Sequence, residues 1–378
     1  MSFPFRIFAR LALLPFIAGP LLAADAPPIK VGEIASLTGK EAAFGQSSHK
    51  GTLLAIEELN AAGGVLGRPI DLVTEDNQSK AGESATAARK LISRDRVTAL
   101  LGEVASSRSL EMAPIAQSSK IPMISPASTN PKVTAIGNYV FRVCFIDPYQ
   151  GTVMAKFSKS ELHLKKVAVL TSVSSAYSVG LAKYFKERFI TDGGDIAIEQ
   201  KYSEGDKDFR SQLTAIKAAG VEGVFVPGYY SEAALIAKQA RELGLTVPLF
   251  GGDGWEAPQL LEIGGAAMEG TYYSTHYSPE DNSPAVQGFV NRFKARFGGE
   301  TPDAMAALGY DSAVFLADAI KRAGSTEPAA VRDALAATKD FAGVTGHTEI
   351  DANRNATKAA VIVTIKDGHF KFLQSVAP

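Results

Sequence analysis

The stretch that decides the fold is VTALLGEVASSRSLEMAPIAQSSKIPMISPAST, residues 97–129. An apolar run ends at Gly102, a polar loop with Ser106 follows, and a helical stretch leads into a second apolar run that ends before Ala127. This order predicts strand, helix and strand. Residues 221–253 repeat the design, with Tyr229 in the first loop and Asp253 after the second strand. Both copies place polar groups beyond the carboxyl ends of successive strands, where open α/β sheets bind ligands.

The same alternation continues along most of the chain, with short β-branched runs between longer helical stretches. Strands are predicted at 30–35, 70–75, 99–102, 122–125, 140–143, 166–171, 196–202, 223–227, 249–252, 271–274 and 360–365. Helices are predicted at 48–61, 82–94, 107–117, 179–191, 209–218, 232–243, 285–297, 304–323 and 329–336. This pattern favours an α/β protein of parallel sheets with helices on both faces, and the two copies predict two lobes facing each other across a cleft.

The first residues have the composition of an export signal. Arg6 and Arg10 precede an apolar run, residues 11–22, which is followed by Ala23 and Ala24. The run is too short for the roughly 20 residues of a spanning helix. We therefore expect residues 1–24 to be a signal peptide, and the mature protein to be soluble and exported.

Length, charge and cysteine content exclude several classes of protein. A chain of 378 residues suggests two or three domains. Lys and Arg number 39 against 40 Asp and Glu, without a basic run, so nucleic acid is not an expected partner. The single cysteine, Cys144, excludes an intramolecular disulfide and a Cys-based zinc site, and we interpret it as a buried thiol. The alternative is a reactive thiol activated by Arg142.

The histidines and the glycine motifs give no cofactor or metal site. The five histidines have no metal-ligand spacing, and we expect a surface or capping role for each of His49, His163, His276, His347 and His369. Residues 38–40, Thr-Gly-Lys, lack the rest of a phosphate loop. Residues 252–257 fit Gly-x-Gly-x-x-Ala, but Asp253 would point a carboxylate at the pyrophosphate that such a turn binds. We expect no metal and no cofactor.

Two polar clusters and one acid suggest the ligand. Ser106-Ser107 and Ser128-Thr129 can cap the helices that follow them, or they can bind a carboxylate beside a helix N-terminus; both interpretations are open. Asp253, on the opposite lobe, can pair with a cation. A ligand with an anionic group at one end and an ammonium at the other is an α-amino acid.

Over essentially the whole mature chain the sequence resembles the type I periplasmic substrate-binding proteins of ABC transporters, in the leucine/isoleucine/valine-binding group. The resemblance rests on motifs in a fixed order rather than on any one of them. They are residues 34–39, Gly45 and Gly51, residues 60–67, 101–102, 124–129, Phe141-Arg142 with Asp147 and Gln150-Gly151, residues 239–244 and residues 251–254.

The resemblance implies roles for individual residues. Hydroxyls of Ser106 and Thr129, with backbone groups at Ala127 and Ser128, would hold the ligand carboxylate. Asp253 matches the ammonium-binding glutamate of the family but is one methylene shorter. The matching aromatic positions are Tyr177, Tyr229 and Phe44, and Phe44 replaces the usual tyrosine. Trp255, the only tryptophan, would narrow the side-chain pocket.

The resemblance also implies the domain organisation and the partner. The chain would cross between lobes near Ile146, His276 and Arg354, so that residues 29–146 and 277–354 form one lobe and residues 147–276 and 355–378 the other. The expected function is a monomeric, non-enzymatic receptor that delivers an aliphatic or branched-chain amino acid to an ABC permease in the inner membrane. The alternatives are a sensor for amides or other small polar or carboxylate ligands, and an exported hydrolase.

Overall fold

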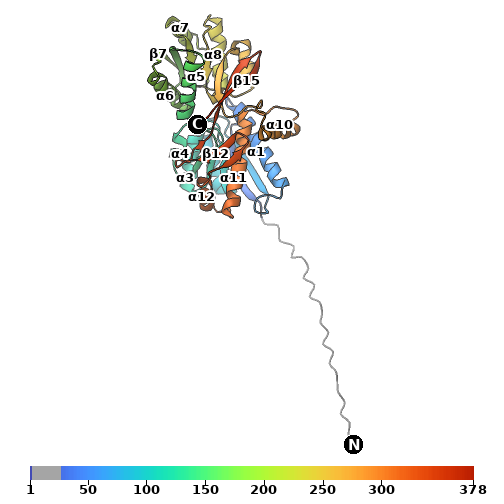
Figure 1. The fold of residues 1–378 in the computed structure, drawn as a ribbon. Coiled ribbons are helices and arrows are strands. Elements are labelled where there is room, and N and C mark those ends of the chain that lie inside the picture. Colours follow the sequence, from blue (N-terminus) through green and yellow to red (C-terminus); the bar gives the residue numbers. More distant parts are fainter. Residues whose placement is uncertain (2–26) are drawn as a thin grey trace.

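The computed structural model describes residue 1 and residues 27–378, so all but the first residue of the predicted export signal lies outside the described part. The described chain forms two α/β lobes, one above the other in Figure 1. The prediction of two lobes with parallel sheets is confirmed. Within residues 27–378, no helix is both long and apolar enough to cross a membrane.

The first lobe is built on a parallel sheet of five strands. In order across the sheet they are β2 (Ile70–Asp76), β1 (Ile29–Ala35), β3 (Ala99–Leu101), β4 (Met123–Ser125) and β5 (Val140–Arg142). Its early helices are α1 (Ala42–Ala61), α2 (Glu83–Lys90) with the π-helical turn η1 (Leu91–Asp95), α3 (Ser106–Ser119) and α4 (Lys132–Ala135). Strands β3, β4 and β5 are buried along their whole length, as expected for strands covered on both faces.

Helices from much later in the chain complete this lobe. They are α10 (Pro284–Arg296), α11 (Ala304–Ala323) and α12 (Pro328–Ala336). Helix α11 packs along α1, as Figure 1 shows in orange beside blue. At Gly51 and Gly309 the two helix backbones approach so closely that an added Cβ would lie about 2 Å from a carbonyl oxygen of the other helix. A small sheet of β11 (Phe341–Gly343), β12 (Gly346–Ile350) and β13 (Ala356–Thr357) follows.

The second lobe contains a sheet of seven strands. Their order is β15 (His369–Val376), β14 (Ala360–Lys366), β10 (Tyr272–Thr275), β9 (Leu249–Gly251), β8 (Gly223–Phe225), β6 (Lys166–Ser172) and β7 (Asp195–Tyr202). The last two strands of the chain, β14 and β15, pair antiparallel and form one edge, which adds a feature to the predicted parallel sheet. The helices are α5 (Asp147–Ser160), α6 (Ala176–Thr191), α7 (Arg210–Ala218), α8 (Tyr230–Glu242) and α9 (Gln259–Gly264), with 3-10 turns η2 (Asp253–Trp255) and η3 (Gly265–Met268).

Helix α5 is the largest element that the sequence pattern missed. It lacks a clear polar face because Gln150, Gly151 and Ser158 are buried along with its apolar residues. Gly151 lets α5 lie against α6, since an added Cβ there would be 2.7 Å from the backbone nitrogen of Phe185. A helix buried on several sides loses the periodicity by which a surface helix is recognised.

Cys144 follows β5 and has no exposed surface. Burial raises the pKa of its thiol to about 12. The prediction of a buried thiol is therefore confirmed, and an activated thiolate at Cys144 is excluded.

Candidate functional site

A small cavity of about 10 Å³ lies between the two lobes. Its lining comes from both of them: Phe44, Val104, Ser106, Ala127, Tyr177, Tyr229, Asp253, Gly254 and Met305. Ligand pockets for drug-sized molecules are typically about 300–1,000 Å³, so this cavity is nearly filled by its own side chains. The chemistry of its lining, rather than its volume, indicates the ligand.

The first-lobe wall is formed where β3 and β4 end. Ser106 is the first residue of α3, and its Oγ accepts a hydrogen bond from the Asn130 N–H at 3.3 Å, which leaves the hydroxyl proton free to donate elsewhere. The Thr129 hydroxyl is buried and has no hydrogen-bond partner among the described residues. Ser106 lines the cavity beside the α3 N-terminus, a position suited to a carboxylate. Thr129, which the sequence also placed at the site, is not part of the lining, and its hydroxyl lies near the Asp147 carboxylate.

Arg142 fixes the loop that carries Thr129. Its guanidinium is completely buried and donates to the carbonyl oxygens of Ser128 and Asn130, the latter at 2.9 Å, and to the hydroxyl of Thr134 at 3.1 Å. A planar, multidentate donor of this kind holds a loop in one conformation. The hydrogen bonds of Arg142 thus hold the loop behind the cavity wall in place.

The buried carboxylate of Glu103 supports the same wall from behind. It accepts from the Ser36 N–H at 2.7 Å, the Ala105 N–H at 2.9 Å and the Asn77 side chain at 3.2 Å. These donors follow β1, β3 and β2, so one side chain joins three strand ends. Burial raises the pKa of Glu103, while its hydrogen bonds oppose the shift.

Aromatic rings form the second-lobe wall. Tyr177 and Tyr229 stack with ring centroids 5.2 Å apart and planes 4° from parallel. Phe44, from the first lobe, meets Tyr229 edge-on at 5.3 Å. The three aromatic residues that the sequence placed at the site are therefore together, and they form an apolar wall across both lobes.

Asp253 lies just after β9, with its carboxylate almost completely buried. It accepts a hydrogen bond from Gln150 Nε2 at 2.7 Å and lies 3.0 Å from His276 Nε2. Burial raises the pKa of Asp253 to about 7, and the hydrogen bonds from Tyr177 and the backbone act in the opposite direction. A buried carboxylate with a raised pKa is stabilised by an incoming cation.

Glycines on either side leave room for Asp253. A Cβ at Gly252 would lie 2.0 Å from Gln150 Oε1 and 2.6 Å from the Tyr177 hydroxyl. A Cβ at Gly254 would lie 2.8 Å from Tyr177 and 2.9 Å from Tyr229. The glycines serve the close packing of this acid and these rings, not a dinucleotide.

Four sequence-based interpretations need correction. The two serine clusters do not cap the helices that follow them. The N-cap residue of α3 is Ala105 and that of α4 is Pro131, and neither helix has a side-chain hydrogen bond at its N-cap. Ser128 turns away from the cavity, with its hydroxyl against Glu103 O and Val104 O and its N–H bonded to Ser125 Oγ, so it supports the loop.

Trp255 and His276 are the other two corrections. Trp255 is outside the cavity lining, because its indole is in the lobe core and donates to Val226 O at 2.9 Å. His276 is neither a surface nor a capping residue; it is buried against Asp253.

Sequence reasoning missed three residues of the lining: Val104, Gly254 and Met305. Val104 and Gly254 are close in sequence to predicted positions, so their nearness to those positions could have identified them. Met305 lies at the start of α11, whose N-cap Asp303 accepts from the Ala306 N–H at 2.9 Å. The contact between α11 and the cavity depends on packing between distant segments.

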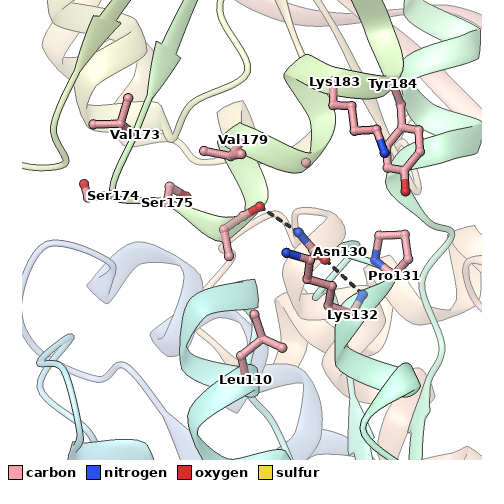
Figure 2. A pocket seen from close by; sticks show the side chains of 12 residues that line it. Leu110, Asn130, Pro131, Lys132, Val173, Ser174, Ser175, Val179, Lys183 and Tyr184 are labelled. Carbon is pink, nitrogen blue, oxygen red and sulfur yellow. Dashed lines mark hydrogen bonds between the residues drawn. The ribbon is translucent and has the colours of Figure 1, made fainter. Parts of the chain in front are cut away.

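The lobes touch at two places. At one, Lys40 Nζ and Glu204 Oε2 are 2.6 Å apart, and the Tyr230 hydroxyl donates to Lys40 O at 3.0 Å. At the other, Asn130 Nδ2 donates to Ala176 O at 2.7 Å, a bond drawn in Figure 2. Figure 2 also shows the groove at that rim, with Leu110 from the first lobe facing Val179 from the second. The lobes are closed on the cavity.

We expect Lys40→Met to weaken ligand binding by about two- to fivefold, mainly through faster dissociation, because a partly exposed ion pair contributes about 1 kcal/mol or less. The effect should shrink as salt rises. Stopped-flow dissociation rates test it. The matched control is Lys50→Met, which removes a pair with Glu300 that does not join the two lobes; equal effects of both variants would contradict the interlobe role.

Comparison with known proteins agrees with this geometry. The model of a family described as periplasmic binding protein matches residues 28–369. The chain belongs to this family. A leucine-, isoleucine-, valine-, threonine- and alanine-binding protein from Pseudomonas aeruginosa is 31% identical over 348 residues, covering 92% of this chain and 91% of that protein.

Two solved structures are similar to this chain over most of its length. A leucine-binding protein, LivK, from Thermotoga maritima is 42% identical with a TM-score of 0.89, covering 93% of this chain and 99% of that one. The branched-chain amino acid transporter substrate-binding protein LivJ from Streptococcus pneumoniae, solved with isoleucine, is 34% identical with a TM-score of 0.88, covering 93% and 100%. Both have the two-lobed fold seen here.

Proposed function

We propose that this periplasmic binding protein captures a branched-chain or other aliphatic amino acid and delivers it to an ABC permease. The observation that carries the proposal is the cavity itself, which places the Asp253 carboxylate and the Ser106 hydroxyl among its walls, one on each lobe. A zwitterion touching both lobes favours the closed form, as a closure mechanism requires.

The walls of the cavity support the class of side chain. Phe44, Val104 and Met305 line it, and all three are buried apolar residues. An apolar ligand side chain would gain about 25 cal/mol per Å² removed from water against them. The similar proteins named for leucine, isoleucine and valine bind side chains of this kind.

We assign the roles from the family resemblance, with support from the residues that line the cavity. Ser106 and Thr129, with the backbone at Ala127, receive the ligand carboxylate, and Asp253 receives the ammonium. Tyr177, Tyr229 and Phe44 cover the ligand. These residues bind and do not catalyse, since the histidine nearest the acid, His276, is directed at Asp253 rather than at a serine nucleophile.

The domain boundaries and the location are part of the proposal. Residues 29–146 with 277–354 form one lobe, and residues 147–276 with 355–378 the other, with the crossings near Ile146, His276 and Arg354 acting as the hinge. Residues 1–24 export the chain to the periplasm, where it acts as a monomer and meets the permease of the inner membrane.

Calorimetry on protein that has been unfolded, dialysed and refolded tests the function. With a panel of amino acids we expect leucine, isoleucine or valine to bind most tightly. Binding of an amide or a simple carboxylate in preference to every amino acid would support the sensor alternative instead. Hydrolysis of esters or amides at an enzymatic rate would contradict a receptor role.

Amino-acid affinity should rise with pH up to about 7 and then level off. The pKa of Asp253 is about 7, and an ammonium placed beside its carboxylate lowers that pKa, so binding releases a proton at lower pH. Below the midpoint, log Kd should fall by at most about one per pH unit. Calorimetry in buffers of different ionisation enthalpy measures the proton release, and Asp253→Asn should abolish it. A flat profile from pH 5 to 8 would contradict this role of Asp253.

A further inference from the structure

Two side chains from separate elements hold the Asp253 carboxylate. Gln150 lies in the first turn of α5, and its amide donates to Oδ1 at 2.7 Å; its Oε1 also accepts from the Asp253 N–H at 3.3 Å. His276 directly follows β10, and its Nε2 lies 3.0 Å from Oδ2. Each carboxylate oxygen therefore has its own nitrogen donor, and all three side chains are buried.

The surroundings of His276 favour a neutral imidazole with its proton on Nε2. Burial, reinforced by the nearby Lys358 ammonium, lowers the pKa of His276 well below its usual range. Its Nδ1 has no hydrogen-bond partner among the described residues, whereas Nε2 faces a carboxylate oxygen. A neutral imidazole places its single proton where an acceptor is available, so His276 donates to Asp253.

His276 also joins this acid to the hinge. Its ring stacks on Phe145, with centroids 3.7 Å apart and planes 27° from parallel. Phe145 lies between β5 of the first lobe and α5 of the second, and His276 lies between β10 and α10, so the stack connects two segments that run between the lobes. His276 thus contacts both Asp253 and Phe145, which lies on a second segment that runs between the lobes.

We propose that His276, together with Gln150, is a positioning residue for recognition of the ligand ammonium: the two donors fix the Asp253 carboxylate at the cavity wall, and His276 transmits its position to the hinge. This inference rests on the proposed function and deepens it. These two hydrogen bonds also explain how a side chain as short as that of aspartate is held in one orientation.

The experiment compares two amide substitutions, His276→Gln and His276→Asn. The glutamine amide can reach the place of Nε2, and the asparagine amide is too short by one methylene. We expect His276→Asn to weaken leucine binding by about 10- to 100-fold and His276→Gln by roughly threefold or less. Tyr273→Phe, in the strand β10 that His276 follows but without contact to Asp253, is the control and should bind like the wild type.

The pH profile of leucine affinity separates positioning from packing. Without the His276 donor the charged carboxylate is less stable, so the midpoint of the profile should move upward by about one pH unit in His276→Asn and stay in place in Tyr273→Phe. The other ionisable groups around this site are the same in every variant; they are Asp147, Cys144, Tyr177, Tyr229 and Lys358. If His276 had a purely structural role, the His276→Asn substitution would weaken leucine binding equally at all pH values.

The outcomes distinguish the inference from the function on which it rests. Should His276→Asn fail to fold, Gln150→Leu removes the other donor and should give the same loss and the same upward midpoint shift. Wild-type affinity and midpoint in the folded variant, or equal losses in His276→Asn and His276→Gln, overturn the inference alone. A wild-type chain that binds no amino acid overturns the proposed function, and the inference with it.

Discussion

Asp253→Ala should lower amino-acid affinity by about 3–5 kcal/mol, a factor of about 150 to several thousand in Kd. The variant leaves the ligand ammonium in a closed cavity without a counter-charge, and it also removes the acceptor of the Gln150 and His276 hydrogen bonds. Removing one partner of a buried ion pair costs far more than losing a surface pair. Isothermal calorimetry with leucine, isoleucine and valine measures the loss.

Two further variants make the Asp253 result specific. Asp253→Asn keeps the shape and loses the charge, so it should lose most of the same affinity. Asp195→Ala removes an exposed carboxylate at the start of β7 in the same lobe and should bind normally. Affinity near that of the wild type in both Asp253 variants would show that the ammonium is bound elsewhere.

Replacement of Ser106 and Thr129 together by alanine should have the second largest effect on affinity. Each hydroxyl is expected to donate to the ligand carboxylate, and a hydrogen bond to a charged group contributes about 1.5–3 kcal/mol. The two losses need not add, because neighbouring donors share one acceptor group. Binding of leucine by the two single variants and the double variant gives both the loss and the coupling.

Ser107→Ala is the matched control for the carboxylate site. Ser107 is the next residue of α3, but its hydroxyl accepts the Ala176 N–H across the cleft at 3.0 Å and does not line the cavity. We expect a small effect through closure alone. If the Ser106 and Thr129 double variant binds leucine as tightly as Ser107→Ala does, the carboxylate is held by other groups.

Part of the site could be predicted because several of its residues follow strands that the local sequence defines, while Phe44 and Tyr177, which lie in helices, came from the family resemblance. Ser106, Ala127, Tyr229 and Asp253 stand just past buried apolar runs, and parallel strands bring such positions to one sheet edge. The order of residues along the chain could not show in which direction each side chain points. Ser128 and Trp255 have suitable positions, yet hydrogen bonds to backbone carbonyls and a packed core turn them away from the cavity.

The sequence by itself determined the two-lobed α/β fold, the buried thiol at Cys144, and the strand ends that carry the binding groups, because these depend on apolar periodicity and on turns between neighbouring segments. Only the tertiary structure brought together residues that are distant along the chain. The contact of His276 with Asp253, its stack on Phe145, and the position of Met305 in the cavity wall are examples. Such contacts arise from the packing of whole elements, and no local pattern of residues encodes them.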